Sequence, residues 1–254
     1  MINPMNLSGK HIVVTGASSG LGKATCLYLS ELGATISLVA RREDRMAETI
    51  AQMNGQNHKA FSYDLTNIEG VEDLVNGIVA VNGKIDGYVH SAGIGTVKPA
   101  SLTKYDFMLE MMSIHLFSFV EFVRIISKKK NSNDGGSIVA VSSASSRMSD
   151  KGKLAYASTK GSLDSAVRSL AIELGEMRSI RANTVNPGWI KTDMYYDYIK
   201  EFGQEKMDEL LRMYALGAAE PEEVASVIAF LMSDASKKIT GQNIFVDSGW
   251  SVHG

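Results

Sequence analysis

Short apolar runs alternate with longer amphipathic stretches along nearly the whole chain. The stretches between the runs carry apolar residues at helical spacing. This alternation predicts an α/β fold of the Rossmann type, with a mostly parallel, seven-stranded sheet and helices on both faces. No linker, repeat or low-complexity segment interrupts it, so we expect a single domain over residues 1–254. The predicted strands are residues 11–15, 35–40, 59–63, 87–91, 137–142, 180–185 and 243–246.

Sheets of this class bind ligands beyond the carboxyl ends of their strands. Four residues that are distant in sequence each follow a predicted strand: Gly16, Gly93, Ser143 and Pro187. The fold therefore predicts that these residues meet at one edge of the sheet.

A glycine-rich turn lies between the first predicted strand and a helical pattern that begins at Leu21. Its glycines are Gly16, Gly20 and Gly22. Backbone N–H groups and the dipole of a helix that begins here favour a pyrophosphate. The spacing differs from Gly-x-Gly-x-x-Gly, so that dinucleotide fingerprint is not the match.

Tyr156 and Lys160 lie four residues apart in a helical pattern that covers residues 153–174. Residues at this spacing share a helix face. A free tyrosine has a pKa of about 10, and a nearby ammonium lowers it. We therefore expect Tyr156 to exchange a proton near neutral pH, although such pairs are also common on solvated helices.

Several motifs together resemble the short-chain dehydrogenase/reductase family. Thr15–Gly22 resembles its Thr-Gly-x-x-x-Gly-x-Gly cofactor motif, and Tyr156-x-x-x-Lys160 with Ser143 resembles its active site. The matches extend from about Leu7 to Trp250. Three later segments also resemble family motifs: Asn186-Pro187-Gly188, residues 239–242 and residues 246–249.

The resemblance implies an NAD(P)-dependent oxidoreductase without a metal. Tyr156 would be the general acid, Ser143 would stabilise the carbonyl oxygen, and Lys160 would also hold the nicotinamide ribose. Asp64 would contact the adenine, and Thr192 the nicotinamide carboxamide. Tyr156 is also expected to contact the cofactor. The remaining cofactor-binding residues expected from the motifs are Gly16, Ser18, Ser19, Gly20, Leu21, Gly22, Leu65, Ala92, Gly93, Pro187, Gly188 and Ile190.

The end of the second predicted strand bears on the choice of cofactor. An NAD site usually has an acidic residue there to bind the ribose 2′-hydroxyl. This chain has Ala40, followed by Arg41 and Arg42. Because arginine binds phosphate through a bidentate fork, we predict NADP(H), with NAD(H) as the alternative. In the competing interpretation both arginines are solvated and Arg42 opens the next helix.

Two positions depart from the family pattern. Residues 90–93 read His-Ser-Ala-Gly where the family usually has Asn-Asn-Ala-Gly, and His115 replaces an asparagine that supports a water relay in many members. Imidazole donates and accepts hydrogen bonds and titrates near neutral pH. His115 is therefore a candidate catalytic residue, and the alternative is a buried histidine with satisfied partners. Ser142 competes with Ser143, but the family spacing favours Ser143.

Composition narrows the choice of partners and compartment. A net charge of −2 over 254 residues gives no reason to expect nucleic-acid or membrane binding. Cys26 is the single cysteine, which excludes an intrachain disulfide. No apolar run approaches the roughly 18 residues of a membrane span, and the chain does not begin with a signal-peptide pattern. We therefore expect a cytoplasmic protein.

The first functional hypothesis is an NADPH-dependent carbonyl reductase, most similar in pattern to 3-oxoacyl-carrier-protein reductases. Its substrate would be a small carbonyl compound or alcohol, either free or on acyl carrier protein. Lys128–Lys130 would meet that acidic carrier, or would form a solvated helix end. The alternatives are a sugar, polyol or steroid dehydrogenase and a non-catalytic NADP-binding regulator. The resemblance also implies a homotetramer.

The apolar segment 194–214 resembles the family's mobile flap over the substrate. Such lids often carry specificity. The alternative is an amphipathic helix that packs on the core.

Overall fold

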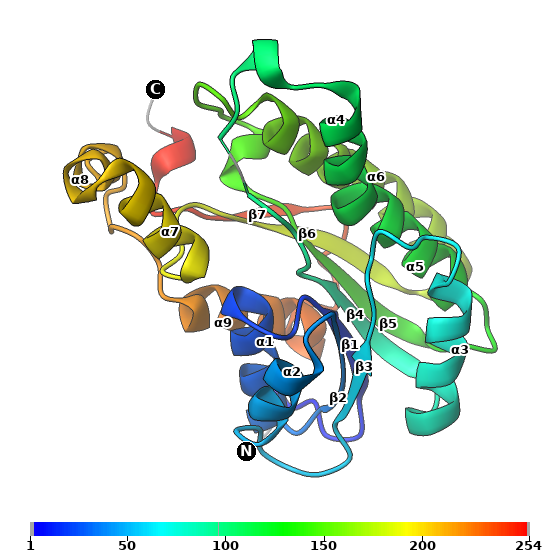
Figure 1. Ribbon diagram of the computed structural model, residues 1–254. Helices are drawn as coiled ribbons and strands as arrows, with labels where there is room; N and C mark the ends of the chain where they lie inside the picture. The colour runs from blue at the N-terminus through cyan, green and yellow to red at the C-terminus, as the bar shows by residue number, and fades with distance from the viewer. Residues whose placement is uncertain (1–2, 96, 253–254) are drawn as a thin grey trace.

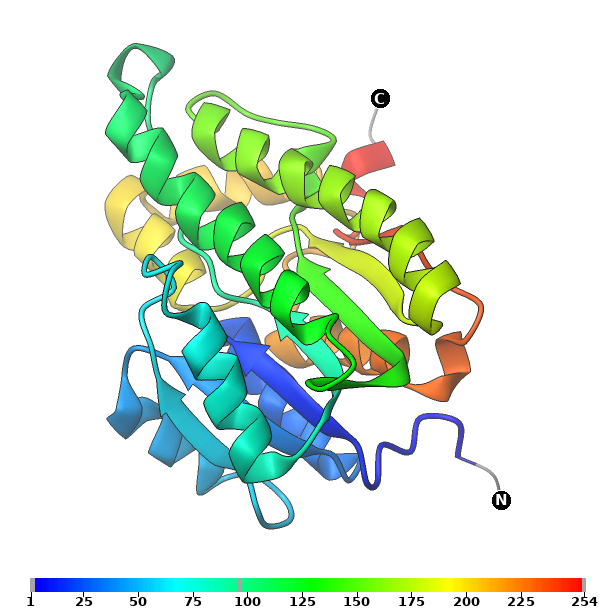
Figure 2. The same ribbon diagram turned by 90° about the vertical axis from the view of Figure 1, so that its right-hand side faces the viewer.

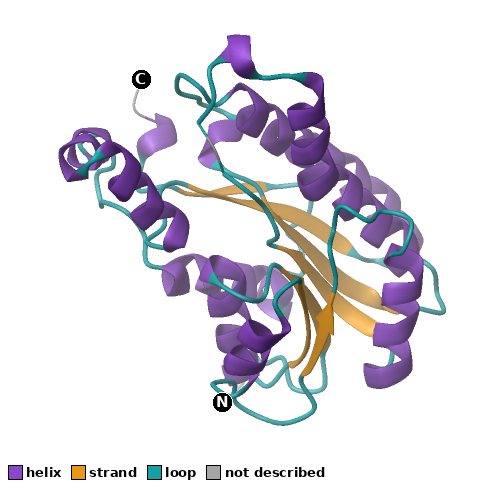
Figure 3. Cartoon of the chain, viewed as in Figure 1, coloured by secondary structure: helices purple, strands orange, loops and turns teal. Residues whose placement is uncertain are grey.

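The computed structural model describes residues 3–95 and 97–252, and its centre is one parallel sheet. The seven strands follow the order β3-β2-β1-β4-β5-β6-β7. The predicted fold class is confirmed, and Figure 3 shows the twisted sheet between its helices. The strands are β1 (His11–Thr15), β2 (Thr35–Ala40), β3 (Lys59–Ser62), β4 (Ile85–His90), β5 (Ser132–Val141), β6 (Arg181–Pro187) and β7 (Asn243–Val246).

Helices cover both faces of the sheet. One layer contains α1, α2 and α9, and the other contains α3, α5 and α6 (Figure 1). Figure 2 shows α5 and α6 running side by side across the second face. The helices are α1 (Gly20–Glu31), α2 (Glu43–Ile50), α3 (Val71–Asn82), α4 (Tyr105–Met112), α5 (Ser118–Ile126), α6 (Leu154–Arg178), α7 (Asp193–Phe202), α8 (Gln204–Leu211) and α9 (Pro221–Met232).

Short helical turns complete the described part of the chain. A π-helical turn at Ser113–Phe117 joins α4 to α5. The 3₁₀ turns are Ala100–Leu102, Ala144–Ser146, Asp234–Ser236 and Trp250–Val252. Within residues 3–95 and 97–252, none of the helices has the length and apolar character that crossing a membrane requires.

The two faces of β1 show why these residues form a central strand. Ile12 and Val14 pack into the apolar cluster with α1 and α9, whereas Val13 packs into the cluster with α3, α5 and α6. Successive side chains of a strand point to opposite faces. A strand with two covered faces therefore needs a continuous apolar run, and this is the pattern at the start of the chain.

The start of β5 differs from the prediction. The strand begins at Ser132 instead of residue 137, because the polar residues before the apolar run still pair with β4. Ser132 aligns with Ile85 and Ser137 with Gly87, so the register shifts between these pairs. Buried Arg178 at the end of α6 donates to the Ser132 carbonyl oxygen at 2.9 Å and to Asp134 Oδ1 at 2.7 Å. These tertiary contacts also extend α6 beyond its predicted end.

Candidate active site

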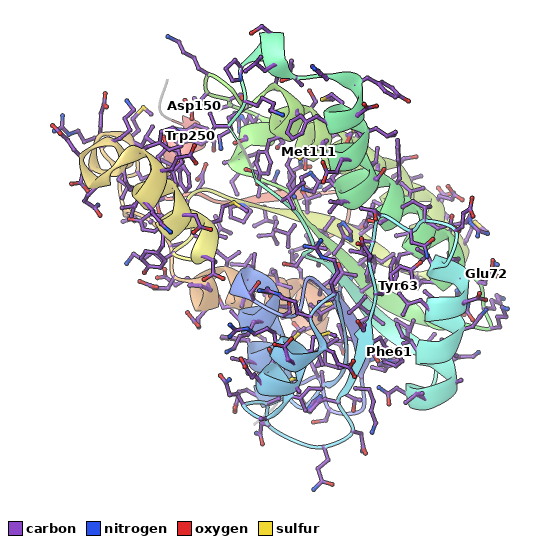
Figure 4. The ribbon with its side chains drawn as sticks, viewed as in Figure 1. Phe61, Tyr63, Glu72, Met111, Asp150 and Trp250 are labelled. Atoms are coloured by element: carbon purple, nitrogen blue, oxygen red, sulfur yellow. The ribbon has the colours of Figure 1, made fainter. Side chains whose placement is uncertain are left out.

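A cavity of about 420 Å³ opens at the carboxyl edge of the sheet. Tyr63, Asp150 and Trp250 all line it, and Figure 4 shows Tyr63 at one end and Asp150 and Trp250 at the other. Every residue that the sequence analysis assigned to the site also lines this cavity: Gly16, Ser18, Ser19, Gly20, Leu21, Gly22, Arg41, Arg42, Asp64, Leu65, Ala92, Gly93, His115, Ser143, Tyr156, Lys160, Pro187, Gly188, Ile190 and Thr192.

The glycine turn after β1 forms a cradle that larger residues would fill. A Cβ atom on Gly16 would lie 2.8 Å from Ala92 Cα, and one on Gly22 only 2.2 Å from the Gly16 carbonyl oxygen. Ser19 caps α1 with extended backbone, and its side chain makes no capping hydrogen bond to the helix. The N–H groups of the first turn of α1 thus lack a side-chain cap. These features fit a dinucleotide pyrophosphate.

Arg42 links the second strand to the glycine turn. Its guanidinium donates to Ser18 Oγ at 3.2 Å and to Ser19 Oγ at 2.9 Å, while its backbone caps α2. Opening the helix is therefore only part of its role. Arg41 is exposed and lines the same cavity. The two guanidinium groups and the absence of a carboxylate at Ala40 fit a cofactor with a 2′-phosphate.

Asp64 and Thr192 have structural roles that the sequence left open. Asp64 Oδ1 accepts hydrogen bonds from the backbone N–H and the hydroxyl of Thr66, both at 2.9 Å. The backbone hydrogen bond from Thr66 is the main cause that lowers the pKa of Asp64. Thr192 caps α7, and its methyl group would lie 3.3 Å from a Cβ on Gly20. Both residues thus shape turns at the edge of the cavity.

Ser143, Tyr156 and Lys160 come together at the end of β5 and the start of α6. Ser143 Oγ accepts from the Ser145 backbone N–H at 3.1 Å, which leaves its own proton for a ligand. Lys160 Nζ lies 5.6 Å from the centroid of the Tyr156 ring and donates to the Val141 carbonyl oxygen at 2.8 Å.

The neighbouring Ser142 is directed elsewhere. Its hydroxyl donates to the Lys160 carbonyl oxygen at 3.0 Å and so ties β5 to α6. This bond occupies the proton that a catalytic serine would donate to a carbonyl oxygen, so the geometry favours Ser143 over Ser142.

The expected lowering of the Tyr156 pKa is wrong for this structure. Burial raises the pKa of Tyr156, and the nearby Ser143 side chain only partly opposes this effect. Burial also lowers the pKa of Lys160 to about 8, against the attraction of Asp164. The spacing on the helix predicted the correct neighbour, but desolvation of the buried phenol is the largest influence on its pKa.

Asn186, the first residue of the motif Asn186-Pro187-Gly188, supports Ser143 in a way that the motif alone did not predict. Asn186 Nδ2 on β6 lies 3.3 Å from the Ser143 carbonyl oxygen, 3.0 Å from Ser146 Oγ and 3.1 Å from the Asp164 carboxylate. Asp164 follows Lys160 by one helical turn, so the i,i+4 rule is the one signal that could have found it. This network fixes the loop after β5 against α6.

Aromatic residues build the far end of the cavity. Trp189 follows β6 and lies 6.2 Å from the ring of Tyr195. Tyr214 stacks on Trp250 at 5.7 Å, with the two rings only 3° from parallel. Within the apolar segment 194–214, three residues line the cavity: Met194, Tyr195 and Tyr214. Tyr198 packs on Trp189 and Phe202 instead, with ring centroids 4.9 and 4.6 Å apart.

Comparisons with known proteins match this chain to one family over nearly its full length. A family model described as enoyl-(acyl carrier protein) reductase matches residues 16–251. An NAD-dependent glycerol dehydrogenase of Listeria innocua is 32% identical over 97% of this chain and 96% of its own. A short-chain dehydrogenase/reductase structure from Serratia marcescens has a TM-score of 0.90 and 27% identity, with 97% of this chain and 99% of the other covered. The chain belongs to the short-chain dehydrogenase/reductase family.

Relatives within this family differ in what they act on. The 3-oxoacyl-[acyl-carrier-protein] reductase of Vibrio cholerae is also 32% identical, over 96% of this chain and 98% of its own. The chain is thus as similar to this reductase as to the glycerol dehydrogenase of Listeria innocua. Membership in the short-chain dehydrogenase/reductase family makes the protein an oxidoreductase. The comparisons do not decide its substrate, which must be inferred from the residues of the cavity.

His115 departs from the usual asparagine of the short-chain dehydrogenase/reductase family and is fully buried. Its Nε2 accepts from the Ile94 backbone N–H at 3.0 Å, so Nδ1 carries the proton and donates to Thr159 Oγ1 at 2.8 Å. Thr159 in turn donates to the Tyr156 carbonyl oxygen at 2.9 Å. Both ring nitrogens are therefore engaged, and the imidazole positions the start of α6.

The expectation that His115 titrates near neutral pH is wrong. Burial, together with the charge of Lys160, lowers the pKa of His115 to about 2. A protonated imidazole would lose the hydrogen bond from Ile94 and would face the buried ammonium. His115 is thus held neutral, and the alternative of a buried histidine with satisfied partners describes it.

His90 replaces the first asparagine of the usual family motif and holds the π-helical turn. Its Nε2 lies 3.2 Å from the Ile114 carbonyl oxygen, and its Nδ1 lies 2.8 Å from the Tyr88 hydroxyl. Ser118 Oγ also donates to the Ile114 oxygen, at 2.7 Å. Burial lowers the pKa of His90 to about 3, so this ring is neutral as well.

Because His90 and His115 are buried and neutral, we expect the folded protein to lose stability in acid. The folded pKa of His115, about 2, lies below the unfolded value of about 6.5, so the unfolded chain binds more protons. Its contribution to stability is present above pH 6.5 and is lost as the pH falls. Each such histidine should cost about 1.4 kcal/mol per pH unit. In urea unfolding, the free energy of unfolding should therefore fall less in acid for His115→Asn than for the wild type.

The same variant has a second expected result. Asparagine can also accept from the Ile94 N–H and donate to Thr159, so His115→Asn should keep its turnover at neutral pH. If His115→Asn lost as much stability in acid as the wild type, the low pKa of the buried imidazole would be contradicted.

Lys128–Lys130 lie away from the cavity. They precede Ser132 at the start of β5, whereas Ser143 follows the other end of that strand. Lys128 Nζ also pairs with Glu72 Oε1 at 2.6 Å. The placement does not favour this segment as the docking point of a carrier that delivers substrate to Ser143.

Proposed function

We propose that this oxidoreductase uses NADPH to reduce a small carbonyl compound to a secondary alcohol, with Tyr156 as the proton donor. The observation that carries the proposal is one cavity lined by the glycine turn, two arginines and the Ser143, Tyr156 and Lys160 side chains. A non-catalytic NADP-binding regulator would not need the last three residues together beside a substrate-sized space.

Each of the three side chains has a role in the proposed reduction. When bound, the nicotinamide supplies the hydride for the carbonyl carbon. The Ser143 proton is free to bond to the carbonyl oxygen, where it stabilises the growing negative charge. Tyr156 then protonates that oxygen as general acid. Its raised pKa keeps the phenol protonated at neutral pH, and this is the form that can donate a proton.

Lys160 stabilises the other side of the proton transfer. Its ammonium lies 5.6 Å from the Tyr156 ring centroid and remains largely charged at neutral pH, since its pKa is about 8. A cation at this place attracts the phenolate that is left after Tyr156 gives up its proton. The hydrogen bond to Val141 fixes the ammonium in position.

The preference for NADPH rests on this chain's own arginines. The relative from Listeria innocua is named NAD-dependent, so similarity alone does not decide the cofactor. Ala40 offers no carboxylate for a ribose 2′-hydroxyl, and Arg41 and Arg42 present two cations near that point. We infer that they hold the 2′-phosphate and that NADH is the poorer donor.

A substrate panel tests the proposed reaction. NADPH oxidation should be measured with free 3-oxoacyl thioesters, carrier-borne 3-oxoacyl chains, sugars and cyclic ketones. Turnover of at least one class, with production of its alcohol, is the expected result. Carrier-borne substrates should have no advantage, because Lys128–Lys130 precede the opposite end of β5 from Ser143. Saturable NADPH binding without turnover of any class would favour the regulator.

We also propose a cytoplasmic homotetramer. Exposed apolar side chains lie on α4, α5 and α6, among them Tyr105, Val120 and Ile172, which are 76%, 46% and 64% exposed. Pairing of these helices between subunits would cover them. Light scattering should give four times the chain mass of 27.5 kDa, and a monomer mass would refute the assembly.

A further inference from the structure

Lys153 brings a positive charge to the substrate end of the cavity. It caps α6, three residues before Tyr156, and its side chain is half-buried and lines the cavity. Its ammonium makes no hydrogen bond and no ion pair within 4.0 Å in the part of the chain that the structure describes. A partly buried and unpaired cation is costly, so a ligand is the natural partner.

Two aromatic rings hold this ammonium beside the reacting groups. Lys153 Nζ lies 5.5 Å from the centroid of Tyr156 and 5.6 Å from that of Trp189. Contacts of this length with two ring faces are attractive. They fix the charge next to the phenol that would protonate the substrate.

The backbone before Lys153 is anchored as well. Gly152 has a φ of +78°, and its carbonyl oxygen accepts from the Lys98 backbone N–H at 2.8 Å. A Cβ on Gly152 would lie 2.7 Å from Val97 Cγ1. The loop is thus held against residues 97–98, so the ammonium is placed before any ligand arrives and less ordering cost remains on binding.

The electrostatic surroundings do not compensate Lys153. It stands at the N-terminus of α6, where the helix dipole disfavours a cation, and the first turn contains no acidic residue. Asp150 lines the same cavity, but it is exposed and lies beyond ion-pair distance. Burial lowers the pKa of Lys153, and Asp150 only partly opposes this effect.

We propose that Lys153 binds an oxyanion, a carboxylate or a phosphate, that the substrate carries close to its reacting carbonyl. The inference rests on the proposed function and narrows its substrate to oxo acids or phosphorylated ketones. Lys153 then determines specificity through a charge-assisted hydrogen bond, while Trp189 covers the adjacent carbon atoms.

Matched substrate pairs test the assignment. We compare 3-oxobutanoate with its methyl ester, and dihydroxyacetone phosphate with dihydroxyacetone, so that each pair differs in the anionic group. The wild type should prefer the anion in at least one pair, which identifies the oxyanion. In Lys153→Gln that preference, as a ratio of kcat/KM values, should fall about tenfold or more. Lys153→Arg should restore most of it.

A nearby lysine provides the control. Lys151 is exposed, lies two residues away and does not line the cavity. Lys151→Gln removes the same charge and should leave the preference unchanged. An equal loss for both members of a pair in Lys153→Gln would show that Lys153 only packs against Tyr156 or adjusts its pKa. That result, or an equal loss in Lys151→Gln, would overturn the assignment.

A binding measurement separates this inference from the proposed reaction. Both tryptophans of the chain, Trp189 and Trp250, line the cavity, so their fluorescence reports on ligands there. In the presence of NADP⁺, which cannot reduce them, 3-oxobutanoate or dihydroxyacetone phosphate should quench it saturably, and Lys153→Gln should weaken that binding about tenfold. No saturable quenching by either anion would refute the oxyanion site, whatever the turnover of neutral ketones.

Discussion

Tyr156→Phe should lower kcat for carbonyl reduction by about 10²–10⁴-fold, the range that general acid catalysis contributes. The phenylalanine ring keeps the shape of the side chain and removes only the proton that the carbonyl oxygen needs. The affinity for NADPH should stay nearly unchanged, because the glycine turn and the arginines are untouched. Steady-state kinetics and a fluorescence titration of NADPH measure the two effects separately.

A second tyrosine provides the control for this loss. Tyr105 is 76% exposed on α4 and does not line the cavity. Tyr105→Phe removes the same hydroxyl and should keep full turnover. Wild-type turnover in Tyr156→Phe would rule out the proton-donor role, and an equal loss in Tyr105→Phe would point to a general effect on folding.

Arg41→Ala should raise the KM for NADPH by about 10–100-fold, the typical effect of losing one charge-assisted contact. The KM for NADH should change little, because NADH lacks the 2′-phosphate. Arg42→Ala should raise the KM for NADPH by a similar factor. It should also affect NADH somewhat, because Arg42 supports Ser18 and Ser19 of the glycine turn. The ratio of kcat/KM for the two cofactors is the quantity to compare.

Arg45 is the matched control for the arginines. It lies on α2, is exposed, and pairs with Glu48 at 3.1 Å outside the cavity. Arg45→Ala should leave the cofactor ratio unchanged. If Arg41→Ala weakens the binding of NADPH and NADH equally, Arg41 does not bind the 2′-phosphate.

The sequence located the parts of the fold that depend on local apolar patterns. Strands β1 and β2 have the predicted limits, because a buried parallel strand needs a continuous apolar run. The polar start of β5 could not be predicted, since it depends on pairing with β4 and on the Arg178 contacts from α6. Such tertiary interactions override local preference.

The same distinction holds for the site. Ser143, Tyr156 and Lys160 could be named from their resemblance to the active-site motif of the short-chain dehydrogenase/reductase family, and they line one cavity as expected. The direction of the Tyr156 pKa could not be predicted, because it depends on burial. Lys153 carried no sequence signal, since its position between two rings depends on Trp189, which is distant in the chain.

The central claim is that this cavity reduces a carbonyl with a hydride from NADPH. Mass spectrometry of the product formed with NADPH deuterated at nicotinamide C4, in separate reactions for its two faces, tests it most directly. We predict that one of the two labelled cofactors gives an alcohol with one deuterium on the former carbonyl carbon. Unlabelled alcohol from both cofactors, or cofactor binding without any alcohol, would contradict the account.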